Sequence, residues 1–176
     1  MTHVVSITDD QVFTVLRNWV MGCVTVVDCL QGPMNRASMP PGGSDFVIMS
    51  PTNRNRLSFN VTDHPTTNTE TNTSSFDYSV QFDCYGPNAG VIANILNDSW
   101  YSNQTFELFK PQGLAPLWID EPRFIPLING EQQYENRWTM QIHVQAKPSI
   151  TDSQQSASTV TINPTGIINV DAKYPG

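Results

Sequence analysis

The chain has 176 residues, of which 39% are apolar and only 14% carry a charge. This length is ordinary for one domain with its own core, and soluble proteins average roughly 25% charged residues. The net charge is −7, whereas tight binding to phosphate backbones requires clustered Lys and Arg. These values argue against nucleic-acid binding and suit either a channel through which DNA slides or an ordinary acidic protein. The many uncharged polar residues are typical of a surface that a partner covers, or simply of a surface with few charges.

The cysteines and the hydropathy pattern argue against further classes. Cys23, Cys29 and Cys84 are odd in number and form no close pair, which disfavours a disulfide framework and a zinc site. The first residues lack a basic segment with a cleavage site, so we expect no signal peptide. No apolar run approaches the roughly 20 residues that a membrane-spanning helix needs.

The first expected element is an amphipathic helix. Thr8 is a good N-cap, and Gln11 three residues later completes a capping box. Apolar residues recur at spacings of three and four over residues 12–30, where they form one broad stripe. Gly32 followed by Pro33 predicts the end of this helix.

A loop at residues 31–45 and two strands are expected next. Phe46 begins a short apolar strand that we expect Pro51 to close. Residues 54–62 alternate between apolar and polar types, which predicts a half-buried strand. Its expected inner face carries Leu57, Phe59 and Val61, and its expected outer face carries Arg54, Arg56, Ser58 and Asn60.

Residues 62–75 are almost entirely Thr, Asn, Ser and acidic residues, so they predict an exposed polar loop or hairpin tip. The strand expected at residues 76–85 should pair with the preceding strand as an antiparallel hairpin. Asn88 is the expected N-cap of a second helix that ends near residues 97–98.

Residues 99–130 contain four prolines, which limit this stretch to short pieces. Short strands are expected at residues 105–109 and 117–119. Asn129 and Gly130 then predict a hairpin turn.

The clearest pattern lies at residues 131–147, where apolar and polar residues alternate from Arg137 to Lys147 and Tyr134 lies in register with the apolar set. We expect one long strand with a core face and a polar, nearly uncharged face, ended by Pro148. Residues 148–176 are expected to form a C-terminal extension that contains strand. The whole pattern predicts an α+β fold in one domain, residues 1–176. A mainly antiparallel sheet should carry the N-terminal helix and the second helix on one side.

Catalytic motifs are weak in this sequence. The three histidines share no metal-binding spacing, and no P-loop or nucleophile-elbow motif occurs. Cys84 with a remote histidine is one candidate nucleophile–base pair, although the position of Cys84 on the apolar side of a strand favours a core role. Glu131 and Glu135 are a second candidate, as an acid–base pair, although a charge ladder on a strand face explains them better.

Partner contacts are the preferred hypothesis for the remaining polar residues, with solvated surface residues as the alternative. The two arginines of residues 54–62 share a strand face, residues 120–123 form a charged loop, and Trp is common at interface hot spots. The candidate interface residues are Arg54, Arg56, Trp118, Asp120, Arg123, Glu131, Glu135, Arg137 and His143.

Four segments together with the opening helix resemble the neck or tail terminator proteins of tailed bacteriophages. They read FVIMSP at residues 46–51, YSVQFDCYGP at 78–87, PLINGEQQYENRW at 126–138 and INVDAKYP at 168–175. The resemblance spans nearly the whole chain, and its motifs are structural.

This resemblance implies a virion protein that assembles in the host cytoplasm into a ring, with a hexamer expected. Such a ring caps the tail tube, ends its polymerisation and joins the head-side connector or stopper, while genome DNA passes through without sequence-specific binding. The implied partners are other copies of the chain, the tail-tube protein, the connector and, as a further candidate, a sheath protein; no membrane, cofactor or catalytic residue is implied. A tail-tube or head-closure protein, a small enzyme and a carbohydrate- or peptide-binding module remain the alternatives.

Overall fold

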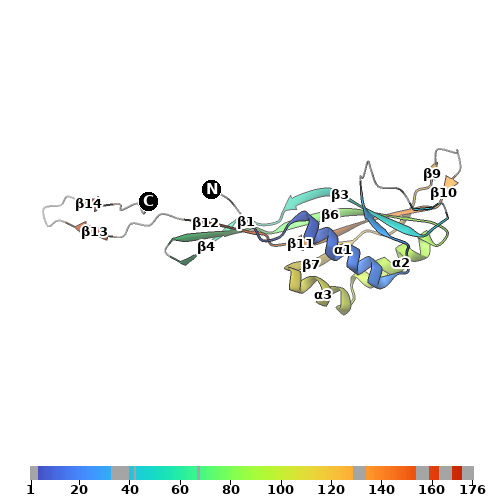
Figure 1. Ribbon diagram of the computed structural model, residues 1–176, viewed down its shortest axis with the longest axis horizontal. Helices are drawn as coiled ribbons and strands as arrows, with labels where there is room; N and C mark the ends of the chain where they lie inside the picture. The colour runs from blue at the N-terminus through green and yellow to red at the C-terminus, as the bar shows by residue number, and fades with distance from the viewer. Residues whose placement is uncertain are drawn as a thin grey trace.

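The computed structural model describes residues 4–32, 40–41, 43–66, 68–128, 134–153, 159–162 and 168–171. Their strands form mainly antiparallel sheets, and the helices lie on one side of the largest sheet (Figure 1). The expected α+β class with an N-terminal helix is therefore confirmed. The molecule is elongated, with a wide end backed by helices and a narrow end made of strands. No helix within these ranges is long and apolar enough to cross a membrane.

Six strands form the large sheet: β2 (Cys29–Gln31), β3 (Phe46–Arg56), β6 (Phe76–Tyr85), β7 (Leu114–Ile119), β8 (Arg123–Phe124) and β11 (Arg137–Ala146). Central strands β6 and β11 pair along their whole length, with Trp138 opposite Cys84 and Ala146 opposite Phe76. β3 flanks β6, while β7 and β8 flank β11, all antiparallel. Only the short β2 joins its neighbour β3 in parallel among the described strands.

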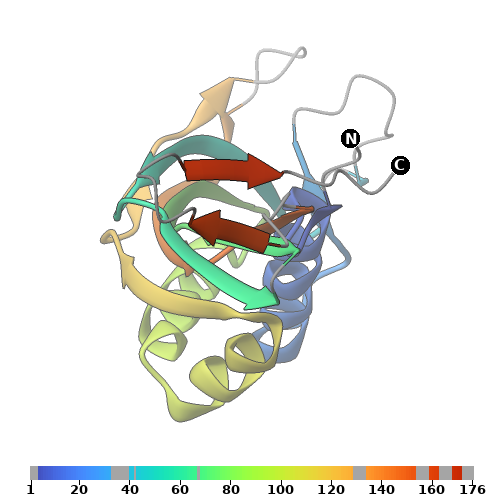
Figure 2. The same cartoon turned by 90° about the vertical axis from the view of Figure 1, so that its left-hand side faces the viewer.

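In the described ranges, three α-helices pack on one face of this sheet: α1 (Asp9–Cys23), α2 (Ala89–Trp100) and α3 (Asn103–Phe109). Figure 2 shows this layering along the long axis. The core between the layers is centred on Trp19 and Trp100, whose rings meet edge to face at 5.0 Å. Trp19 Nε1 donates a hydrogen bond to Thr105 Oγ1 at 2.8 Å, which ties α1 to α3.

The first helix is shorter than its apolar stripe predicts. The capping box at Thr8 and Gln11 is present, which confirms the expected start. The helix nevertheless ends at Cys23, because Val24 adopts an extended backbone with φ −135° and ψ 154°. Val24 opens a run rich in β-branched residues at positions 24–27, and such residues favour extended structure. The remainder of the predicted stripe continues into β2 instead.

β3 runs through Pro51, which was expected to close it. The pairing with β6 shifts register between Pro51 and Asn53 and leaves Thr52 as the extra residue. The Thr52 hydroxyl donates a hydrogen bond to the Ser79 carbonyl at 2.9 Å. A bulge of this kind accommodates a proline inside a strand, because the ladder is already interrupted there.

A second sheet, called the arm here, extends the narrow end of the molecule. It contains β1 (Val4–Val5), β4 (Val61–Thr66), β5 (Thr69–Thr73) and β12 (Ser149–Ser153), in the order β1-β12-β5-β4. Along the chain β3 leads into β4, β5 into β6 and β11 into β12, so the arm prolongs the large sheet (Figure 1). Residues 62–75 were expected to form an exposed polar loop or a hairpin tip. They mostly form the hairpin of β4 and β5, so the second alternative is the one that agrees with the structure.

The expected strand at residues 54–62 is wrong as a single element. β3 ends at Arg56, and β4 begins only at Val61 after four residues outside either strand. Leu57, Phe59 and Val61 were expected to face the core, but their side chains are 48%, 93% and 66% exposed. The pairing of β3 with β6 confirms the expected antiparallel hairpin, with the arm between its two strands.

The segment at residues 105–109 is helical, which corrects the predicted strand. The Ser102 side chain caps α3 by accepting a hydrogen bond from the Thr105 backbone N–H at 3.2 Å. The strand at residues 117–119 is confirmed within β7, and α2 is confirmed but extends to Trp100. Asn88 makes no side-chain cap; the Asp45 carboxylate instead accepts hydrogen bonds from its backbone N–H and its side chain.

Two short hairpins complete the described structure. β9 (Leu127–Ile128) pairs with β10 (Tyr134–Glu135), and the turn predicted at Asn129 and Gly130 between them lies outside the described residues. β13 (Thr159–Ile162) pairs with β14 (Ile168–Asp171), so the C-terminal extension contains strand as expected.

Candidate functional site

The alternation predicted for residues 131–147 is borne out over β11. Met140, Ile142 and Val144 are buried against the helices. The intervening side chains lie on the opposite face of the sheet, which is termed the polar face here. It includes Asp77, Ser79, Gln81 and Asp83 of β6 and Arg137, Thr139, Gln141, His143 and Gln145 of β11. Because both strands contribute polar side chains in register, this face is one continuous polar surface.

His143 is the centre of a buried cluster on the polar face. Its Nδ1 lies 3.0 Å from an Asp77 carboxylate oxygen and 3.2 Å from Ser79 Oγ. A hydrolase triad needs the carboxylate and the serine on different ring nitrogens, whereas both partners here meet Nδ1. The cluster consequently fixes the orientation of the imidazole and does not arrange a nucleophile.

Trp118 lies flat on the same imidazole. The two ring centroids are 4.1 Å apart with an interplanar angle of 19°. The pairing of β7 with β11 shifts register between Ile142 and Val144, so two residues of β7 lie opposite His143. This bulge directs the Trp118 side chain onto the polar face, where it remains 44% exposed.

Arg137 forms an ion pair on the polar face. Its Nε donates to Asp83 Oδ1 at 3.2 Å, and Gln81 also donates to both oxygens of that carboxylate. Arg137 and Asp83 are mostly buried, with 21% and 10% of their side chains exposed. Glu135 lies in β10, whereas Glu131 lies outside the described residues. The candidate acid–base pair of Glu131 and Glu135 therefore cannot be placed as a pair, because only Glu135 is among the described residues.

Arg54 and Arg56 lie on the other side of the sheet from His143. Arg54 covers the Tyr78 ring at 4.3 Å and pairs with Asp9 at the start of α1. Arg56 covers the Phe76 ring at 4.9 Å and donates to the Asn60 side chain. The two arginines share one face, as expected, and they lie where the large sheet passes into the arm.

Asp120 directly follows β7, and Arg123 is the first residue of β8. The Asp120 backbone N–H donates to the Gln141 carbonyl at 2.8 Å, and both side chains point to solvent. A cleft of about 160 Å³ opens beside them on the polar face. Its lining comprises Gln81, Asp120, Glu121, Arg123, Ile125, Thr139, Met140 and Gln141. The structure thus brings Asp120 and Arg123 near Trp118, and it places Arg54 and Arg56 elsewhere.

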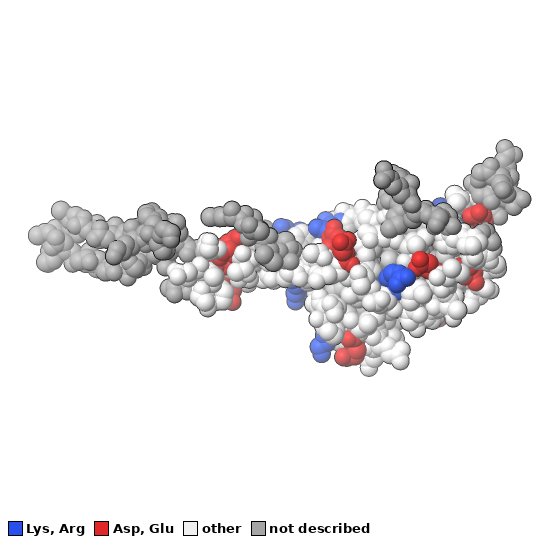
Figure 3. All heavy atoms as spheres, viewed as in Figure 1, with Lys and Arg blue, Asp and Glu red and all other residues white. Residues whose placement is uncertain are grey.

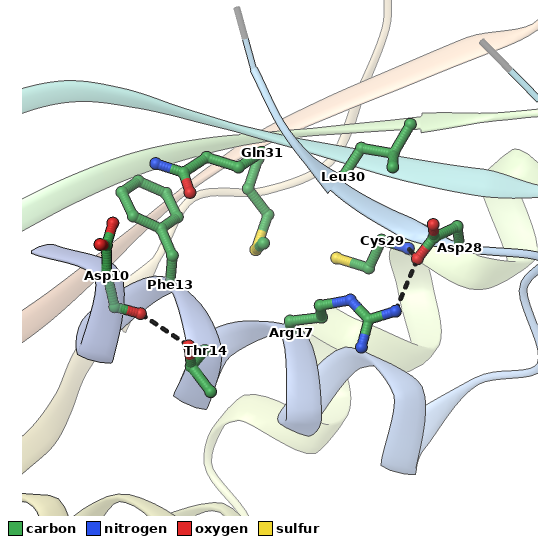
Figure 4. A pocket seen from close by; sticks show the side chains of 9 residues that line it. Asp10, Phe13, Thr14, Arg17, Asp28, Cys29, Leu30 and Gln31 are labelled. Carbon is green, nitrogen blue, oxygen red and sulfur yellow. Dashed lines mark hydrogen bonds and ion pairs between the residues drawn. The ribbon is translucent and has the colours of Figure 1, made fainter. Parts of the chain in front are cut away.

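A pocket of about 330 Å³ lies between α1 and strands β2 and β3 (Figure 4). Phe13, Cys29 and Met49 form its apolar floor, and Arg17 and Asp28 form part of its rim. Arg17 Nη2 and Asp28 Oδ1 are 2.8 Å apart, and this hydrogen bond lowers the pKa of the Asp28 carboxyl. The pocket offers shape and apolar surface, and the described residues contain no His, Cys, Asp and Glu cluster suited to a metal ion.

The cysteine thiols give no support to a nucleophile. Cys29 and Cys84 are 2% and 0% exposed, and burial raises the pKa of each thiol to about 12. Burial also raises the pKa of Cys23. Because their pKa values are raised, these thiols remain protonated near neutral pH. The thiolate is the reactive form of cysteine, so none of them is set up as a nucleophile. Cys84 belongs to the apolar core, in agreement with its position in the alternating pattern of β6.

Phe59 is the candidate contact residue that the sequence pattern misses. It was assigned to an inner strand face, yet it is the most exposed large apolar side chain among the described residues. The only sequence signal for this exposure is that polar Ser58 and Asn60 flank Phe59. In the structure, β3 ends at Arg56, before Phe59 is reached. Recognising that signal requires knowledge that β3 ends at Arg56.

Comparisons with known proteins address identity directly. The search of curated proteins found no significant match. A family model described as phage neck terminator protein matches residues 10–171 of the 176. This range begins in α1 and ends with β14, so it includes the large sheet, nearly all of the arm and the C-terminal hairpin. The chain therefore belongs to the family of phage neck terminator proteins.

Proposed function

We propose that the chain is the ring-forming tail terminator of a phage neck. Several copies, six by expectation, close into a ring that caps the finished tail tube and ends its polymerisation. The other side of the ring binds the head-side connector, and genome DNA passes through the central hole. Membership of the neck terminator family supports the structural role at the head–tail junction.

The observation that carries this proposal is a sheet with two different lateral edges. β2 and β4 lie on one edge, because β4 continues from β3, and β7, β8 and β1 lie on the other. Contacts between two different patches of identical subunits generate rings when the rotation closes. Exposed strand edges are also common templates for contacts between chains.

The charge distribution supports passage of DNA without binding. Charged side chains are few and scattered over the face shown in Figure 3. On the polar face, Asp77 and Asp83 are each engaged by His143 or Arg137. Sequence-independent DNA binding requires a basic stripe, and the net charge of −7 opposes one.

The proposed partners are further copies of the chain, the tail-tube protein, the head-side connector and a sheath protein. Assembly in the host cytoplasm precedes incorporation into the virion neck, and the chain acts as one domain over residues 1–176. This role needs no catalytic residue or cofactor.

Native mass spectrometry together with a tube-growth assay tests the proposal. We expect a closed ring of six copies that stops the polymerisation of purified tail-tube protein when present in small amounts. Open-ended tubes made by the chain itself would indicate a tail-tube protein. A ring that binds the connector and leaves tube growth unchanged would indicate a head-closure protein.

A further inference from the structure

Large exposed apolar side chains occur on both lateral edges of the sheet. The Phe59 edge comprises the edge strand β4, which pairs with β5 on one side among the described strands, and residues 57–60 before it. Its Leu57, Phe59 and Val61 are 48%, 93% and 66% exposed. The Trp118 edge comprises β7, β8 and the residues between them and after β8. Its members Trp118, Phe124 and Ile125 are 44%, 54% and 44% exposed. Singly exposed apolar residues are common, but groups of them mark contact surfaces.

The loop that carries Phe59 is fixed although the side chain meets solvent. The Leu57 N–H donates to the Ser75 carbonyl at 2.8 Å, and the Ser75 N–H donates to Ser58 Oγ at 3.2 Å. Arg56 donates to the Asn60 side chain on the far side of Phe59. Bonds on both sides of Phe59 hold the loop before any contact forms, which lowers the entropy lost on binding.

Trp118 is held in a comparable way on the opposite edge. The β7 bulge directs it, and stacking on His143 supports its ring, while Asp77 orients that imidazole. After Trp118 in the chain, Asp120 and Ile125 help to line the cleft of about 160 Å³. A cavity of about 150 Å³ holds a benzene molecule, so a phenyl ring fits this space, with Ile125 as its apolar wall.

The charges beside the two edges differ in sign. Arg56 and Lys147 lie near the Phe59 edge, where Lys147 lines a groove with Leu57 and Val61. Among the described residues, neither basic group has a carboxylate partner. Asp120 and Glu121 follow Trp118 and likewise have no cationic partner in that part of the chain, and Arg123 reduces their net charge to about −1. Complementary charges of this kind steer association and fix register.

We infer that the Phe59 edge of one copy docks on the Trp118 edge of the next, with the Phe59 ring in the cleft beside Trp118. The inference rests on the proposed ring, and it assigns the lateral contact of that ring. Each copy uses both edges, so the contact is heterologous and repeats around the ring. Arg56 then lies near Asp120 and Glu121 of the neighbouring copy.

Mixing two variants tests this pairing. Phe59→Ala leaves only the Trp118 edge intact, and Trp118→Ala leaves only the Phe59 edge intact. Each variant alone should be monomeric by native mass spectrometry. An equimolar mixture should contain a heterodimer of one copy of each and nothing larger, because only one productive contact remains. A self-paired Phe59 contact predicts instead a homodimer of the Trp118→Ala variant alone. Either that homodimer or a purely monomeric mixture overturns the inference.

Controls separate this inference from the proposed function. Val91→Ala removes a side chain that is 60% exposed on α2, away from both edges, and should leave the ring intact. Circular dichroism should show that all variants remain folded. Wild-type rings together with rings of both edge variants would overturn the pairing and leave the terminator role standing. A wild-type chain that never forms a ring, even with tail tubes present, would overturn both.

A charge exchange provides a second, independent readout. Arg56→Glu should weaken the ring by electrostatic repulsion, and Glu121→Arg in the same chain should restore it, since the two charges meet across the contact. Glu107→Arg, on exposed α3, is the matched control and should restore nothing. Equal rescue by both substitutions would show a general effect of net charge and would contradict the assigned register.

Discussion

The helix-backed body and the arm are joined by strands that follow one another along the chain, but they are stabilised differently. In the body, β6 and β11 bury apolar side chains against three helices, and residues such as Phe82 and Ile142 are fully buried. In the arm, strand β5 consists of Thr, Glu and Asn, and no described helix covers the arm strands. Burial of apolar surface therefore stabilises the body, whereas backbone ladders and threonine pairs hold the arm.

This difference separates stability from assembly. A polar sheet of a few strands has little stability of its own, so the arm depends on the body to which it is joined. Its exposed residues are correspondingly available for contacts with other chains. Substitutions in the body should mainly change unfolding, and substitutions in the arm should mainly change assembly.

The sharpest test compares one residue type in the two regions. Phe82 is 0% exposed in β6 and Phe59 is 93% exposed before β4. Phe82→Ala should lower the free energy of unfolding by about 3–5 kcal/mol, because it removes buried contacts and leaves a cavity. Phe59→Ala should change it by less than about 0.5 kcal/mol. Urea unfolding of both variants measures this, and similar losses would show that the arm contributes a core of its own.

A glycine at the end of β6 gives the next largest effect. Gly86 has φ +108°, and an added Cβ would lie 2.5 Å from the Ser44 carbonyl oxygen and from Asp45 Oδ1. Gly86→Ala should therefore cost about 1–3 kcal/mol in backbone strain. The clash should add to this cost, because Asp45 also accepts hydrogen bonds from Asn88, just before α2.

Gly43 is the matched control for this substitution. It has φ +81° but no atom within 4 Å of an added Cβ, so Gly43→Ala should cost only about 1–2 kcal/mol. Thermal unfolding of both variants isolates the clash. Equal costs would show that the loop carrying Ser44 and Asp45 moves freely, and that it does not brace the body.

The body was largely predictable because its apolar periodicity reflects its packing. The alternation over β6 and β11 indicated both strands and their core faces, and the capping box located the start of α1. Its end was not predictable, since the apolar stripe continues into β2 while only the extended backbone of Val24 separates the two. Tertiary pairing of β2 with β3 decided that boundary.

The arm and the contact residues were harder to predict for the opposite reason. Residues 62–75 have no apolar period, so strand β5 within them depends on its pairing with β12, which is distant in sequence. The contact between His143 and Asp77 needs the register of β6 against β11, and the stacking of Trp118 needs a bulge. The sequence pattern predicted candidate contact residues, but not that Asp77, His143 and Trp118 meet on one face.

A threonine pair tests how the arm is held. Thr71 Oγ1 and Thr151 Oγ1 are 3.0 Å apart on paired strands β5 and β12. Thr71→Ala should cost roughly 0.2–1 kcal/mol, which is typical of a cross-strand pair. Hydrogen exchange should become faster in β5 and β12 and remain unchanged in β6, because local opening is confined to the arm. Faster exchange throughout β6 would show that arm and body unfold as one unit.

The smallest expected effect concerns the ion pair that joins α1 to the start of β2. The Arg17 hydrogen bond lowers the pKa of Asp28 below its ordinary value, so the folded state favours the carboxylate. Its stabilisation is therefore complete above the unfolded pKa of about 3.9 and is lost as the pH falls through the lower folded pKa. Both side chains are more than a third exposed, so Arg17→Met should cost less than about 1 kcal/mol near neutral pH.

Thermal unfolding from neutral to acid pH should show the wild-type and variant curves converging below about pH 4. Curves that stay parallel would mean that Arg17 acts through the packing of its stem, as a part of the apolar body, and not through its charge.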